Sequence, residues 1–344
     1  MLLVQKRMEA MKTIATKKNP TVVVIGGGTG NFTLLGQLKL YTQNITAIVS
    51  MADDGGSTGI LRDELGVLPP GDVRQCLVAL SPESSKVRQL FNYRFGEGTM
   101  EGHAFGNLFL TALEKMTGSF AEAVETASEV LRITGKVTPI TLDNVRLVLD
   151  VAPGFKVRGE GNIDILHFNK QGTHPTLSLE PVAHINPEAR EAILAADLVV
   201  IAPGDLYTSV GPALIVDGVT EALARTSATI AYVCNLVTKP GQTDGFTVAD
   251  YASEIERFAG GPILDYVLYN TAEPNATLFQ KYTKQRELPV ETGNLDNVHY
   301  KLIGRPFVSN AITAVAANDP LAVHRSFIRH DADAVAQCLF GLLS

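Results

Sequence analysis

Two glycine-rich segments constrain the fold of this chain most, because each directly follows a short run of β-branched residues. The first segment is Gly26-Gly27-Gly28-Thr29-Gly30, after Val22–Ile25, and the second spans residues 53–59, after Ile45–Met51. Neither apolar run alternates with polar residues, which is typical of parallel strands covered on both faces. The apolar residues between 32 and 40 suit a helix. The pattern predicts an α/β fold with a Rossmann-like, doubly wound and mostly parallel sheet.

Both glycine segments are suited to binding phosphate. Glycine has no Cβ, so backbone N–H groups can approach an anion, and the N-terminus of a following helix adds a positive dipole. The spacing departs from G-x-G-x-x-G, and the alternative is that the glycines only form tight turns. The candidate ligand-binding residues of these segments are Gly27, Gly28, Thr29, Gly30, Asp53, Asp54, Gly55, Gly56 and Ser57.

Length and charge narrow the class of protein. The 344 residues, 45% of them hydrophobic, can form one large domain or two ordinary ones. A formal net charge of −7 argues against a general nucleic-acid binder, and no apolar run is long enough to span a membrane. We expect a cytoplasmic protein whose residues 1–20 form a mobile arm, neither signal peptide nor anchor. Cys76, Cys234 and Cys338 are expected to be buried thiols.

Two short motifs in the first half add candidate ligand contacts. LPPGDVR places Asp72 and Arg74 in the first turn of a predicted helix over 73–80, where polar groups can reach a ligand. The alternative is that Asp72 is the N-cap of that helix and Arg74 its ion-pair partner. GHAFGN contributes Asn107 at the entry to another helix, a second seat for an anion, whereas His103 alone is more often structural.

In residues from about 136 to 185, extended runs replace the alternation of strands and helices, which predicts a small β-rich insertion. Two extended runs flank Ala152-Pro153-Gly154, which is typical of a hairpin. We expect the insertion to pack on the edge of the main sheet. Asn186-Pro187 then predicts a helix start, and the alternation of strands and helices resumes.

The second half repeats the strand-then-polar-loop pattern of the first. Strands ending near residues 201, 233 and 270 are followed by polar residues, and parallel strands bring all these loops to one sheet edge. With the two glycine segments, five loops would then form a crevice rich in neutral donors and poor in fixed positive charge. Such a crevice suits a phosphate-bearing small molecule. The candidates from these loops are Gly204, Asp205, Thr208, Ser209, Asn235 and Thr238.

Several ordered motifs resemble a known family. IGGGTGNFTLLGQL, MADDGGSTGILRDELGVLPPGDVRQCL, GHAFGNLFLTAL, APGDLYTSV and NLVTKPGQTDG are similar to those of YvcK-type gluconeogenesis factors, which are related to the 2-phospho-L-lactate transferase of deazaflavin-cofactor biosynthesis. The resemblance covers about residues 20–343. It implies a single Rossmann-like domain over 21–344, a cytoplasmic location and binding of UDP-sugars, UDP-N-acetylglucosamine in particular. It also implies a role in gluconeogenic growth and in cell shape or wall synthesis, with no established reaction.

The resemblance also bears on individual residues. It places Tyr282 and Arg329 in the UDP-sugar pocket, where a tyrosine can stack on uracil and an arginine can bind phosphate. From the sequence alone, Tyr282 could equally be a surface residue, and Arg329 and His330 could be ordinary polar residues before a helix capped by Asp331. APGDLYTS departs from the family's usual GPGSLYTS, so Asp205 stands where a hydroxyl is usual.

Three functions remain open at this stage. The first is a UDP-sugar-sensing regulator that requires no cofactor, with a homodimer or a metabolic or cell-wall protein as further expected partners. The second is a transferase of phosphorus-containing groups, in which Asp53 and Asp54 would hold Mg²⁺ between phosphates. The third, an NAD-dependent enzyme, is supported only by the first glycine segment.

Overall fold

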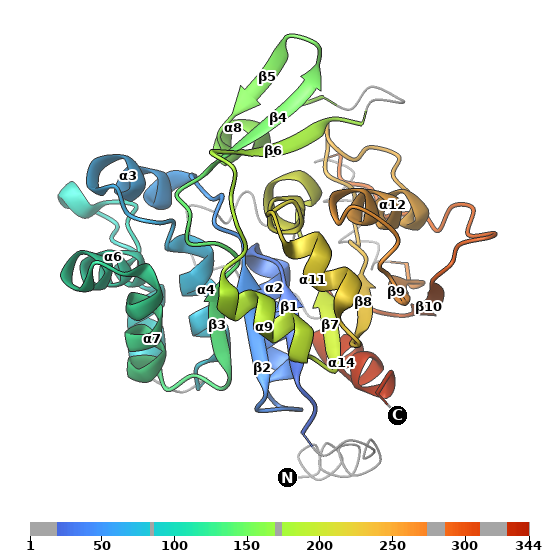
Figure 1. Ribbon diagram of the computed structural model, residues 1–344, viewed down its shortest axis with the longest axis horizontal. Coiled ribbons are helices and arrows are strands. Elements are labelled where there is room, and N and C mark those ends of the chain that lie inside the picture. The colour runs from blue at the N-terminus through green and yellow to red at the C-terminus, as the bar shows by residue number, and fades with distance from the viewer. Residues whose placement is uncertain (1–18, 83–85, 169–173, 274–285, 310–328, 344) are drawn as a thin grey trace.

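The structure is a computed structural model that describes residues 19–82, 86–168, 174–273, 286–309 and 329–343 (Figure 1). Its centre is a seven-stranded parallel sheet in the order β10-β9-β8-β7-β1-β2-β3, which confirms the predicted fold class. The strands of this sheet are β1 (Val22–Ile25), β2 (Ile45–Val49), β3 (Lys136–Pro139), β7 (Leu198–Ile201), β8 (Thr229–Val233), β9 (Tyr266–Asn270) and β10 (Lys301–Arg305). The chain builds outward from β1 in one direction and from β7 in the other. The topological switch point therefore lies between β1 and β7.

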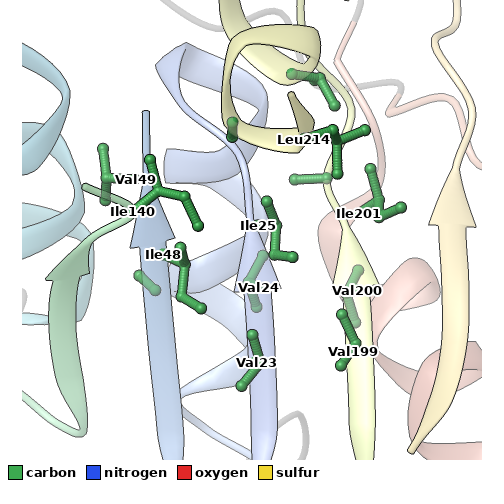
Figure 2. Close-up of a cluster of buried hydrophobic side chains, with 14 of the residues drawn as sticks. Val23, Val24, Ile25, Ile48, Val49, Ile140, Val199, Val200, Ile201 and Leu214 are labelled. Atoms are coloured by element: carbon green, nitrogen blue, oxygen red, sulfur yellow. The ribbon is translucent and has the colours of Figure 1, made fainter. Parts of the chain in front are cut away.

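The central strands are buried because helices cover both faces of the sheet. Every residue of β1 and β7 is fully buried, and Val24 lies in register with Ala47 and Val200. Figure 2 shows the side chains of β1 in one layer between those of β2 and β7. Since the layer is closely packed, an Ile48→Ala change would leave a void and cost about 2–5 kcal/mol.

The helices lie in two layers (Figures 1 and 2). One layer holds α2 (Gly28–Leu38), which packs against α4 (Gly71–Leu80) and α14 (Ala332–Gly341). The other holds α9 (Pro187–Ala195), α10 (Gly211–Leu214) and α11 (Val219–Arg225), and α12 (Val248–Phe258) packs on α10. The remaining helical segments are α3 (Gly56–Leu65), α5 (Lys86–Asn92), η1 (Gly98–Met100), α6 (Phe105–Thr117), α7 (Phe120–Leu131) and the π-helical turn η2 (Leu206–Val210).

A separate antiparallel sheet stands over the carboxyl ends of the main strands (Figure 1). It consists of β4 (Arg146–Ala152), β5 (Phe155–Arg158) and β6 (Thr176–Glu180) in the order β5-β4-β6, with α8 (Glu160–Asp164) beside it. The predicted hairpin and β-rich insertion are confirmed. The expected start near residue 136 is wrong, because β3 pairs with β2 in the main sheet; the small sheet begins at Arg146.

Several local predictions can be compared directly with the structure. Asn186 caps α9 by accepting a hydrogen bond from the N–H of Glu188, as expected, and all three cysteines are buried and free. Strand β10 was not predicted. No helix in the described part of the chain is both long and apolar enough to cross a bilayer. The predicted N-terminal arm lies almost entirely outside the described residues.

Candidate functional site

A cavity of about 880 Å³ opens at the carboxyl edge of the main sheet. The loops that follow β2, β1, β7 and β8 line it, so it straddles the switch point, where ligands bind in doubly wound folds. The structure thus brings residues from both halves of the chain together. The predicted site residues on its lining are Gly27, Gly28, Thr29, Gly30, Asp53, Gly55, Gly56, Ser57, Asp72, Arg74, Asn107, Gly204, Asp205, Thr208, Ser209, Asn235, Thr238 and Arg329.

Among the described residues, one predicted site residue is not on this lining, namely Asp54. Asp54 instead accepts hydrogen bonds from Arg146 Nη1 at 3.0 Å and from the N–H of Gly161 at 2.9 Å. Tyr282 lies outside the described residues. The loop after β9 was also expected in the crevice. Asn270 instead donates a hydrogen bond to the carbonyl oxygen of Ala272 and accepts one from the N–H of Phe307.

The Asp53–Asp54 pair does not fit a bound Mg²⁺. Only Asp53 faces the cavity, because the Asp54 carboxylate is taken by Arg146 and Gly161. Among the described residues, no three His, Cys, Asp or Glu side chains are grouped closely enough to hold a metal ion. A cation at this place would have to take most of its ligands from a bound phosphate.

The first glycine segment is occupied by a side chain of the protein itself. The N–H of Gly28 donates to Asp72 Oδ1 at 3.2 Å, and a Cβ on Gly27 would lie 2.1 Å from Asp72 Oδ2. Asp72 is therefore not the N-cap of α4, as one alternative held; Pro70 is the cap, and Asp72 reaches from the first turn across to the β1 loop. Glycine is required at position 27 because this carboxylate packs against it.

Three acidic side chains from different elements crowd the same side of the cavity: Asp53, Asp72 and Glu160. Burial, with a contribution from the nearby Asp53 charge, raises the pKa of Asp72 to about 7 and that of Glu160 to about 9. Burial also raises the pKa of Asp53, although the N–H of Gly55 stabilises its charge at 2.9 Å. The cluster therefore holds protons at neutral pH. Glu160 was missed, because nothing in the sequence places α8 over the cavity.

A chain of hydrogen bonds links the GHAFGN motif to the second glycine segment. Arg74 Nε donates to Asn107 Oδ1 at 2.9 Å, Asn107 Nδ2 donates to Ser57 Oγ at 3.3 Å, and Ser57 Oγ lies 3.0 Å from His103 Nδ1. Gly106 is needed here, because a Cβ would lie 2.8 Å from the stem of Arg74. His103 thus has a structural partner, as expected, but that partner is itself a cavity residue.

The other side of the cavity is organised around Lys239. Its Nζ contacts Asp164 Oδ1 and lies 2.7 Å from Asp205 Oδ2, so the unusual acid in APGDLYTS has a cationic partner. Burial and the charge of Asp205 raise the pKa of the neighbouring Glu287 to about 7. Lys239 and Glu287 were both missed. Lys239 stands among the polar residues of a predicted loop, a signal that could have found it.

Arg329 and His330 complete the lining before α14. Asp331 caps that helix by accepting from the N–H of Ala334 at 3.1 Å, as expected. Burial lowers the pKa of His330 to about 4, and its Nε2 lies 3.0 Å from the carbonyl oxygen of Cys234. His330 is therefore neutral at physiological pH, and Arg329 carries the positive charge of this segment.

Helix α8 of the insertion is fastened on both sides of the cavity. On one side Asp54 accepts from the N–H of Gly161 at 2.9 Å, and on the other Lys239 pairs with Asp164. Gln242 Nε2 adds hydrogen bonds to the carbonyl oxygens of Ile163 and Asp164 at 2.8 and 3.0 Å. The small sheet thereby helps to enclose the site.

Comparison with known proteins yields a consistent set of relatives. The family model of 2-phospho-L-lactate transferase CofD matches residues 22–308. The gluconeogenesis factor of Bacillus subtilis is 37% identical over 327 residues, covering 95% of this chain and 99% of that one. The gluconeogenesis factor of Halalkalibacterium halodurans is 42% identical over 274 residues, covering 79% and 84%. A crystal structure of a UPF0052-family protein from Bacillus halodurans has a TM-score of 0.84 at 38% identity, covering 94% and 99% of the two chains.

Proposed function

The chain belongs to the CofD family, and from this premise we propose that it is a gluconeogenesis factor that binds a UDP-sugar, UDP-N-acetylglucosamine in particular. The observation that carries the proposal is the cavity of about 880 Å³ at the switch point of the sheet. Its volume lies within the range of small-molecule sites, and its lining mixes backbone donors, hydroxyls and charged groups. Ligand binding would report on precursors of the cell wall, which supports a role in gluconeogenic growth and cell shape.

One feature favours a nucleotide sugar over a dinucleotide. Asp72 occupies the backbone N–H of the first glycine segment, where a dinucleotide pyrophosphate would bind. Arg329 lies on the cavity lining close before α14, and its guanidinium suits a diphosphate, a group that nucleotide sugars and dinucleotides share.

Differential scanning fluorimetry with UDP-N-acetylglucosamine and with NADH tests the proposal. Ligand at a hundred times its Kd stabilises the folded state by about 2.7 kcal/mol, which raises the melting temperature by several degrees. We expect this rise with the UDP-sugar and none with NADH. A rise with NADH alone would overturn the proposal.

A second candidate is a transferase of phosphorus-containing groups, favoured by the match to the CofD model. Asp53 would be its acidic group, because Asp53 and not Asp54 faces the cavity. After incubation with UDP-N-acetylglucosamine and Mg²⁺, we expect chromatography to recover the ligand intact. Release of UDP or UMP by the wild type, lost in Asp53→Asn, would show the enzyme instead.

A further inference from the structure

Helix α5 and the residue that follows it carry apolar side chains on two different sides. Phe91 faces inward, where its ring packs against that of Phe105. Val87, Leu90 and Tyr93 are instead 36%, 45% and 52% exposed. They are spaced three residues apart, and the N–H of Tyr93 continues the helical turn by donating to the carbonyl oxygen of Leu90 at 3.0 Å. Single exposed apolar residues are ordinary, but three along one stripe form a patch, which is typical of an interaction surface.

The segment after α5, residues 93–105, holds this patch on a fixed backbone. Its two ends are joined by a hydrogen bond from the N–H of Phe105 to the carbonyl oxygen of Tyr93 at 2.8 Å. Side chains alternate along an extended segment, so Arg94 lines the cavity while the rings of Tyr93 and Phe95 pack together, with centroids 5.2 Å apart. The outer surface of this segment therefore lies directly behind a wall of the cavity.

The charges on this surface are separated by its apolar residues. Lys86 is the first residue of α5, whereas Glu97 and Glu101 flank η1, and all three are exposed. Arg88 adds no outward charge, because its guanidinium lies 5.9 Å from the ring centroid of Phe32 and donates to the carbonyl oxygen of Ser81. We call the whole surface the α5 face; its apolar residues are Val87, Leu90, Tyr93 and Met100.

A surface with a basic end, an apolar centre and an acidic end is complementary to itself. In a pair of copies related by a two-fold axis, each contact occurs twice with the roles exchanged, so both charged ends find an opposite charge. A partner with charge of a single sign would leave one end unmatched. The apolar centre with a charged rim also has the usual composition of a protein–protein interface.

We propose that the α5 face is an interface between two copies of this chain, related by a two-fold axis close to Tyr93. Lys86 of each copy then lies against the acidic end of the partner subunit. The inference goes beyond the proposed function and does not depend on the ligand. It places the contact between subunits behind the cavity wall that carries Arg94.

Sedimentation velocity of the full chain over a dilution series tests the apolar centre. We expect the wild type to sediment with the mass of two copies, and the dilution series gives the dissociation constant of the dimer. Tyr93→Ser should weaken the dimer at least 10-fold, because a tyrosine at the centre of an interface contributes strongly to binding. Val182→Ser is the control, because Val182 is 67% exposed but follows strand β6 of the small sheet. Its dissociation constant should match the wild type.

Charge reversal tests the two-fold pairing. Lys86→Glu alone, and Glu97→Lys with Glu101→Lys in a second variant, each place like charges against one another at both ends of the interface. Either variant should dimerise roughly 3- to 30-fold more weakly than the wild type. In a mixture of the two variants, every reversed charge meets an opposite one, so the mixed dimer should recover the wild-type affinity. Melting curves identify a variant that fails to fold, and Tyr93→Ser then carries the test.

Three results would overturn the inference. The first is a wild type that stays monomeric at the highest concentration. The second is a dimer whose dissociation constant is the same in Tyr93→Ser and in both charge variants, because the interface would then lie elsewhere. The third is a mixture of the charge variants that dimerises no better than either alone, because the two ends of the α5 face would then not meet.

Discussion

The carboxylate of Asp72 accepts a hydrogen bond from the backbone N–H of Gly28 at 3.2 Å, although 44 residues separate them in the sequence. An acidic side chain of α4 thus occupies the N-terminus of α2, the place that binds pyrophosphate in dinucleotide folds. The glycine segment therefore does not leave this N–H free for a ligand. Its glycines accommodate a carboxylate of the protein and, at Gly30, the carbonyl oxygen of Pro203.

Replacing Asp72 by Asn should stabilise the protein at alkaline pH. The pKa of Asp72 rises from 3.8 to about 7 on folding, so between these values the native state holds a proton that the unfolded state has lost. Stability contributed by this group therefore falls as pH rises from about 4 to 7, by up to about 4 kcal/mol. Asparagine carries no such penalty and can still accept from Gly28. We expect Asp72→Asn to melt several degrees above the wild type at pH 8, and the difference to shrink at pH 5.

Asp150→Asn is the matched control for this measurement, because Asp150 lies in the small sheet and its Oδ2 is 3.6 Å from the Lys156 amine. Its melting temperature should follow the wild type at both pH values. A difference between Asp72→Asn and the wild type that is the same at pH 5 and pH 8 would contradict the raised pKa.

Much of the fold could be predicted because its signals are local. Residues 22–25 form an unbroken β-branched run followed by glycines, which is typical of a strand buried on both faces. β10 was missed because Lys301 and Arg305 bound a run interrupted by Gly304, and the strand lies at the sheet edge, where partial exposure removes the apolar pattern. Edge strands carry weaker signals than central ones.

The site could be predicted only in part, for a different reason. Glycines and polar residues directly after strands fall at the carboxyl edge whatever the details of packing, so Ser57 and Thr208 were found. Glu160 reaches the cavity only because the insertion folds back over it. The direction of an individual side chain also escapes a sequence pattern: Asp53 and Asp54 are adjacent, yet only Asp53 faces the cavity.

Arg329→Ala should greatly weaken binding of a UDP-sugar. An arginine–diphosphate contact in a partly desolvated cavity is worth about 2–4 kcal/mol, which corresponds to roughly 30- to 1000-fold in affinity. Tyr282→Ala is expected to act in the same direction through lost stacking on uracil. Isothermal titration calorimetry measures both, with Arg225→Ala as control, because Arg225 pairs with Glu221 on the surface of α11. Wild-type affinity in both Arg329→Ala and Tyr282→Ala would show that other residues hold the nucleotide.

Asp54→Asn should destabilise the protein without ligand more than it weakens ligand binding. The Asp54 side chain is only 9% exposed and joins Arg146 to the loop after β2. Losing its charge leaves Arg146 with Asp63 alone and weakens the anchor of the small sheet, at a cost of about 1–3 kcal/mol. We expect the melting temperature to fall by a few degrees. An unchanged melting temperature with lost UDP-sugar binding would instead show that Asp54 contacts the ligand and does not anchor the small sheet.

Lys239→Gln should loosen helix α8 over the cavity. The Lys239 amine joins Asp164 of the insertion to Asp205 of the β7 loop, and its side chain is only 23% exposed. Two partly exposed ion pairs together contribute about 1 kcal/mol, so local opening of residues 160–168 should become roughly 5-fold more frequent. Hydrogen–deuterium exchange measures this as faster exchange of those amides, while exchange in the main sheet stays the same.

The matched control is Lys156→Gln. Lys156 lies on β5 of the small sheet, and its partner, Asp150, lies on the neighbouring strand β4 and not across the cavity. Exchange over 160–168 should then equal that of the wild type, because no contact between the insertion and the main sheet is lost. If Lys239→Gln also exchanges like the wild type, the ion pairs do not hold α8 in place. The hydrogen bonds of Gln242 to the carbonyl oxygens of Ile163 and Asp164 would then be sufficient to do so.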